Sequence, residues 1–89
     1  MRAIVTVIGK DTVGIIADVC TLLAQQGVNV LDISQTVMQG YFTMMMVVEV
    51  SQCNTPLAQL TTVMEEMGKE KGLSIRVQRE DIFEAMHRV

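Results

Sequence analysis

The sequence has few aromatic residues and no cluster of positive charge. Among 89 residues there are one tyrosine, two phenylalanines and no tryptophan, and ten acidic residues outnumber seven basic ones, for a formal net charge of −3. Nucleic-acid binding needs a cationic surface that displaces counterions, often with aromatic rings that stack on bases. This composition therefore argues against nucleic acid as a partner.

Histidine and cysteine are also scarce. His87 is the single histidine, and Cys20 and Cys53 lie far apart in the sequence. Two isolated cysteines make neither a disulfide framework nor a metal-ligand spacing, and a zinc site needs three or four ligands. Asp11 and Asp32 are carboxylates that could approach each other, but helix capping and solubility explain them as well. We therefore expect no metal, no cofactor and no catalytic activity.

Long apolar runs are missing, although the chain as a whole is apolar. No run reaches the roughly 20 residues that cross a bilayer, and the first residues do not have the plan of a signal peptide. These observations predict a cytoplasmic protein with no membrane partner. Hydrophobic residues nevertheless make up 49% of this short chain. Because exposed apolar surface costs about 25 cal/mol per Å², we expect an oligomer, either a homodimer or a tetramer.

Apolar periodicity predicts one α+β domain with the element order βαββαβ and a short terminal helix. Strands are expected over residues 2–8, 28–38, 41–50 and 73–79. The first helix is expected over residues 13–26. The second is expected to begin at Thr55-Pro56 and to end at Gly68 and Gly72. Residues 1–80 would form the domain, with a core over about 4–78, and residues 81–89 a helical extension.

Right-handed crossovers fold this order into a ferredoxin-like sandwich. Its four-stranded antiparallel sheet would have the strand order 4-1-3-2, with both main helices on one face. The first and third strands are apolar on both sides, which fits central positions, so the uncovered face would expose a patch that needs a partner. We expect a second copy and the terminal helix to cover this patch between them.

The strand over residues 28–38 looks like an edge strand with one wet or ligand-facing side. Strict alternation places Leu31, Ile33 and Val37 on one face, and Val30 with Asp32 on the other, more polar face. The next strand contains three consecutive methionines, at positions 44–46. Because neighbouring strand residues point to opposite faces, these thioethers cannot converge on one ion, so we interpret them as packing residues.

The stretch between the first strand and the first helix is the best candidate for a binding site. Gly9 and Gly14 allow a tight turn or a close approach, and Asp11 or Thr12 can cap the helix that follows. The free N–H groups at the start of a helix can also hold a carboxylate. A plain strand-to-helix turn explains the same residues, and the motif alone does not decide between the two interpretations.

Several motifs together resemble the ACT domain. They are residues 3–17 (AIVTVIGKDTVGIIA) and residues 26–30 (QGVNV). Residues 32–36 (DISQT), 41–44 (YFTM) and 82–86 (IFEAM) narrow the resemblance. With them the chain is similar to small bacterial proteins made of a single ACT domain, relatives of the glycine cleavage system transcriptional repressor. The resemblance covers essentially the whole chain.

The resemblance implies a regulatory module that binds an amino acid or another small effector between paired domains. Ligand contacts would come from the loop before the first helix and from the start of the second strand. Carried over to this sequence, these positions are Asp11, Thr12, Val13, Gly14, Asn29 and Val30. The backbone N–H groups from Val13 to Ile15 could hold a carboxylate, and Asp32, on the polar face of the second strand, is a further candidate. Many amino-acid-binding ACT domains have Pro-Gly where this chain has Val13-Gly14, which leaves the identity of the ligand open.

Two functions follow from this resemblance. The first is a stand-alone regulator that binds an amino acid at a homodimer interface and passes that binding to another protein by linkage. The second is a ligand-free module that serves only for dimerisation or docking. A thermal-shift screen separates them, because a bound ligand raises the melting temperature by mass action.

Overall fold

The structure is a computed structural model, and it describes residues 1–10, 14–53 and 56–86. Four strands and three helices follow one another along the chain. They are β1 (Arg2–Gly9), α1 (Ile15–Gln25), β2 (Asn29–Met38), β3 (Tyr41–Glu49), α2 (Leu57–Lys71), β4 (Ser74–Arg79) and α3 (Glu80–Met86). The strands form one antiparallel sheet in the order β2-β3-β1-β4, which confirms the predicted topology and its central strands β1 and β3.

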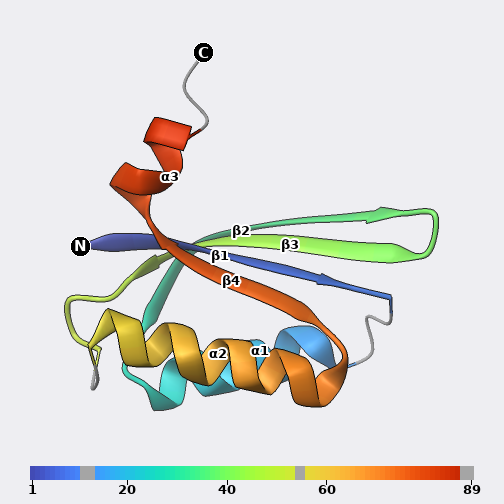
Figure 1. Cartoon of the computed structure of the whole chain (residues 1–89), viewed down its shortest axis with the longest axis horizontal. Helices are drawn as coiled ribbons and strands as arrows, with labels where there is room; N and C mark the ends of the chain where they lie inside the picture. Colours follow the sequence, from blue (N-terminus) through green and yellow to red (C-terminus); the bar gives the residue numbers. More distant parts are fainter. Residues whose placement is uncertain (11–13, 54–55, 87–89) are drawn as a thin grey trace.

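The helices α1 and α2 cover one face of the sheet, and α3 lies on the other side (Figure 1). The core is built from alternate residues of the central strands, which point toward α1 and α2. These residues are Ala3, Val5, Val7, Phe42, Met44, Met46 and Val48, each at most 2% exposed. Leu60 and Met64 of α2 and Val19 and Leu23 of α1 close the core from the helix layer.

Two glycines lie at other places in their helices than the sequence predicted. Gly14 was expected inside the first turn of α1, and that prediction was wrong: it is the N-cap, with φ 75°, a left-handed conformation that favours glycine. Asp11, Thr12 and Val13 lie outside the described residues, so their capping stays a prediction. Gly68 does not end α2 but lies buried within it, and the helix ends at Gly72 with φ 71°.

Strand β2 contains a bulge that strict alternation could not reveal. Val30 pairs with Val48 and Asp32 pairs with Val47, so Leu31 is an extra residue between two adjacent partners. The prediction that Val30 shares a face with Asp32 was therefore wrong. Val30 packs against the core, whereas Asp32 lies on the face opposite α1 and α2, which we call the open face.

The open face is only partly covered within one chain. Helix α3 contacts β1 and β4 and stands at the end of the sheet where β1 begins (Figure 1). Arg2 of β1 fixes the first residue of α3, since its Nε and Nη2 both donate to Glu80 Oε1, at 3.1 and 2.7 Å. On this face Ile4 is 7% exposed, whereas Ile8 is 42% and Met45 36% exposed. The exposed patch expected from the sequence is present.

Candidate ligand-binding site on the open face

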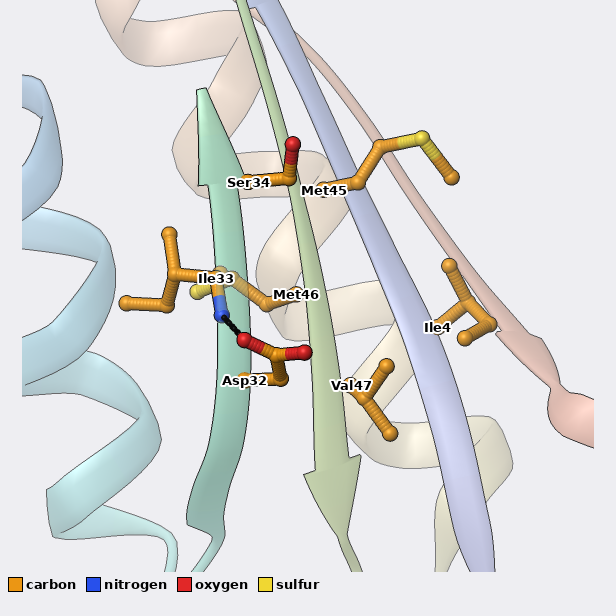
Figure 2. A pocket seen from close by; sticks show the side chains of 7 residues that line it. All are labelled: Ile4, Asp32, Ile33, Ser34, Met45, Met46 and Val47. Atoms are coloured by element: carbon orange, nitrogen blue, oxygen red, sulfur yellow. Dashed lines mark hydrogen bonds between the residues drawn. The ribbon is translucent and has the colours of Figure 1, made fainter.

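A recess of about 170 Å³ opens on the open face, between side chains of three neighbouring strands (Figure 2). Its lining residues are Ile4, Asp32, Ile33, Ser34, Met45, Met46 and Val47. The recess follows from the strand register, because Val47 pairs with both Asp32 and Ile4, and Met45 pairs with Ser34. The apolar side chains of the central strands thus form a wall beside the only charged residue of the lining.

Asp32 has the chemistry to hold a cationic group. Its Oδ1 accepts one hydrogen bond, at 2.9 Å, from the backbone N–H of Ile33. Within residues 1–10, 14–53 and 56–86, the ion pairs of the structure do not involve Asp32. An ammonium group can therefore pair with the carboxylate while an apolar side chain rests on Ile4 and Val47.

The size of the recess limits what it can hold. Pockets for drug-sized ligands have volumes of roughly 300–1,000 Å³, and this recess is smaller. It also lies on an open sheet surface, so a second surface is needed to bury a ligand there. The arrangement suits a molecule of amino-acid size that becomes enclosed when another surface covers the sheet.

The sequence-predicted site residues are not all brought together. Gly14 is the N-cap of α1, and Asn29 begins β2 just beyond the other end of that helix. The 11 residues of α1 have a length of about 16 Å, so one small ligand cannot contact both residues within one chain. Val30 faces the core and cannot offer its side chain to a ligand on the open face.

The other predicted ligand contacts lie in β2 and around the start of α1. Asp32 is the one that lines the recess. Ile15 is the first residue of α1. Asp11, Thr12 and Val13 are not among the described residues, so their proposed ligand contacts stay predictions.

Six lining residues were not predicted as ligand contacts: Ile4, Ile33, Ser34, Met45, Met46 and Val47. The sequence did indicate part of this wall: β1 and β3 are apolar on both faces, so some of their apolar side chains had to lie on the open face. What was missing was the register, which brings Asp32 of β2 level with Val47 and Ile4. The bulge at Leu31 sets this register, and the sequence pattern alone does not predict it.

A cluster of charged and polar groups at the end of the sheet has a structural role. The N-terminal ammonium of Met1 donates to Glu49 Oε1 at 2.8 Å, and Ser51 donates to the same oxygen from its backbone and its hydroxyl. The bond from the ammonium, followed by those from Ser51, lowers the pKa of Glu49 to about 2. These contacts tie the start of β1 to the end of β3.

The described part of the chain has neither a candidate metal site nor a candidate membrane-spanning helix. No group of three or more histidine, cysteine, aspartate or glutamate side chains there could hold a metal ion. None of the helices that the structure describes combines the length and the apolar character needed to cross a membrane.

Comparison with known proteins identifies what this fold is similar to. The family model of the ACT domain matches residues 2–78. A UPF0237 protein of Bifidobacterium longum is 52% identical over 88 residues, which cover 99% of this chain and 98% of that protein. The solved structure of an ACT domain protein from Streptococcus pneumoniae is 45% identical, with a TM-score of 0.84 and 98% of both chains covered.

A more distant structure links the fold to a named regulator. A putative glycine cleavage system transcriptional repressor is 25% identical, with a TM-score of 0.75. The match covers 86% of this chain and 44% of the repressor chain. The resemblance drawn from the sequence motifs is thereby confirmed at the level of the fold and of the family.

Proposed function

The chain belongs to the ACT domain family, and from this premise we propose that it is a stand-alone regulatory module that binds an amino acid at a homodimer interface. Binding would be passed to a partner protein by linkage: the ligand favours one arrangement of the pair, and the partner recognises that arrangement. ACT domains are regulatory modules for small effectors, and the likeness to a glycine cleavage system repressor is in keeping with such a role.

The Asp32 recess is the main structural support for amino-acid binding. It combines the Asp32 carboxylate, which has no ionic partner among the described residues, with an apolar wall of Ile4, Met45 and Val47. This is the complement of an ammonium group beside an apolar side chain. The recess is open to solvent within one chain, so a second copy would complete its enclosure. Asn29 and the segment Asp11–Ile15 remain proposed ligand contacts on the strength of the resemblance to the family.

A thermal-shift screen against the twenty amino acids tests this function. We expect at least one amino acid to raise the melting temperature of the wild-type protein, by mass action on the folded state. Asp32→Asn should remove that shift, since the amide keeps the shape but not the charge. Glu66→Gln, which changes an exposed residue of α2, is the matched control and should retain it.

Two further variants test the other proposed contacts. Asp11→Ala and Asn29→Ala should also reduce the shift if those residues reach the ligand. A shift that survives Asp32→Asn unchanged would show that the recess is not the site.

A second candidate function is a ligand-free dimerisation or docking module. Strand β2 favours it, because Leu31 to Met38 are exposed throughout this edge strand, with Val37 and Met38 each 66% exposed. Such an edge is a template for pairing with another chain. Under this alternative no amino acid would shift the melting temperature, whereas the protein would still self-associate.

A further inference from the structure

The open face carries two charged side chains that have no ionic partner in the described part of the chain. They are Asp32 on the edge strand β2 and Arg76 on the opposite edge strand β4. Other charges on this face are engaged: Arg2 pairs with Glu80, and Glu49 with the N-terminal ammonium. The face is therefore negative at one edge, apolar in the middle and positive at the other edge.

Register places these two charges on neighbouring rows. Arg76 pairs with Thr6, Thr6 with Met45, and Met45 with Ser34, so one row of residues crosses the sheet from β4 to β2. Asp32 lies on the next row of the same face, level with Val47 and Ile4. Within one chain the two edge strands are three strand spacings apart, about 14 Å, so the charges cannot meet.

A two-fold axis parallel to the strands brings these charges together between two copies. Such an axis places β2 of one copy over β4 of the other and keeps every row at its own level. Arg76 of the second copy then lies above Ser34, beside Asp32. Because packed sheets are about 10 Å apart, a long arginine side chain can span much of the gap.

We propose that two copies of this chain pack open face to open face about this axis, and that each contributes Arg76 to the Asp32 recess of the other. This inference rests on the homodimer of the proposed function and adds the face, the axis and the second charged group. The recess then offers a carboxylate and a guanidinium on either side of an apolar wall. That is the complement of a zwitterion, with the ammonium on Asp32 and the carboxylate on Arg76.

The position of α3 agrees with this packing. Within its own chain α3 contacts β1 and β4, and in the described part of the chain it makes no comparable contact with β2 and β3, so the half of the open face formed by those two strands is left uncovered. The same two-fold axis carries α3 of each copy toward the uncovered half of the other. Each chain would therefore cover the part of its partner's sheet that the partner's own α3 does not reach.

The area of the face indicates a weak dimer. Four strands about 4.8 Å apart, with a rise of about 3.3 Å per residue, offer roughly 500 Å² over the eight residues of β1. Two such faces fall near or below the ~1,200 Å² at the lower end of stable interfaces. A contact of this size dissociates readily, so a ligand bound between the faces would shift the monomer–dimer equilibrium appreciably.

Charge reversal tests the packing by sedimentation equilibrium. Asp32→Arg and Arg76→Asp each place like charges together twice in a homodimer, which should weaken dimerisation roughly a hundredfold. An equimolar mixture of the two variants pairs opposite charges again and should restore dimerisation. Glu66→Arg, a charge reversal on the exposed side of α2, should leave the equilibrium unchanged.

The outcomes separate this inference from the proposed function. Variants that dimerise like the wild type place the contact elsewhere, such as the edge of β2, and overturn the inference while leaving a homodimer. A wild-type protein that stays monomeric at all concentrations, with or without amino acids, overturns both. Single variants that are monomeric and do not recover on mixing exclude the Asp32–Arg76 contact.

A ligand measurement tests the second charged group. The twenty amino acids are screened by thermal shift against wild type and Arg76→Gln. Loss of the stabilisation in Arg76→Gln supports a carboxylate held by Arg76, whereas an equal stabilisation in both proteins overturns it. If no amino acid stabilises the wild type, amino-acid binding is overturned both in the proposed function and in this inference.

Discussion

Val30 and Asp32 pair with adjacent residues of β3, Val48 and Val47, although they are two residues apart in β2. The bulge at Leu31 therefore turns one side chain to the core and the other to the open face. Without it, both would lie on the same side. This single extra residue makes Val30 a packing residue and leaves Asp32 free to face a ligand.

Substitutions at these two positions should have opposite effects on stability and binding. Val30→Ala should lower the free energy of unfolding by about 1 kcal/mol, since it removes partly buried methyl groups that pack on the core. Asp32→Ala should change it by no more than about 0.5 kcal/mol, yet should abolish stabilisation by an amino acid. Urea unfolding with and without the amino acid measures both quantities. Equal loss of ligand stabilisation in the two variants would contradict the assignment of the faces.

Gly68 is buried in α2 because strand β4 passes against it. An added Cβ would lie 2.9 Å from the Leu73 carbonyl oxygen and 3.1 Å from Ile75 Cγ1. Alanine gains up to about 1 kcal/mol in helix propensity, but forced repacking of a core costs about 1–3 kcal/mol. We therefore expect Gly68→Ala to lower the free energy of unfolding. Gln59→Ala, on the exposed side of α2, is the control, and a Gly68→Ala protein as stable as that control would refute the close packing.

Met44 and Met45 are neighbours in β3 with different environments. Met44 is completely buried, and Met45 is 36% exposed on the open face. Met44→Ala should cost about 2–5 kcal/mol through lost burial and a cavity, and Met45→Ala less than about 1 kcal/mol. Chemical denaturation at low protein concentration compares them. Similar costs at both positions would contradict the alternation of the strand.

The Glu49 cluster makes stability depend on acid pH. The pKa of Glu49 is about 2 in the folded protein and ordinarily 4.5, so its contribution is complete above pH 4.5 and is lost as the pH falls from about 4.5 to 2. Glu49→Gln should flatten this part of the pH profile of urea unfolding. Acetylation of the N-terminus should do so in part, since the ammonium is the largest cause of the shift. Superimposable profiles for wild type and Glu49→Gln would contradict the cluster.

Much of the fold could be predicted because β1 and β3 are apolar on both sides. That feature identifies the central strands, and the order of the elements then determines the sheet. The division of the methionines followed from alternation alone: Met44 and Met46 are in the core, and Met45 is outside it. Patterns of this kind depend only on residues that are neighbours in sequence, and they were sufficient to predict the strands and their buried faces.

The recess could not be predicted in the same way. It depends on the register between β2 and β3, which the bulge at Leu31 shifts, and on side chains from strands far apart in sequence. The separation of Gly14 from Asn29 likewise depends on the length and direction of α1. Motif resemblance joins those two positions into one site, whereas the geometry of one chain assigns them to opposite ends of a helix.

That an amino acid binds in the Asp32 recess is tested directly by an NMR titration of the wild-type protein with an amino acid that stabilises it, followed through the backbone amide signals. The largest shifts should map to residues 32–34 and 45–47 and to Ile4, around the recess. Perturbations confined to the start of α1 and to Asn29, with the signals of the open face unmoved, would contradict binding in the recess.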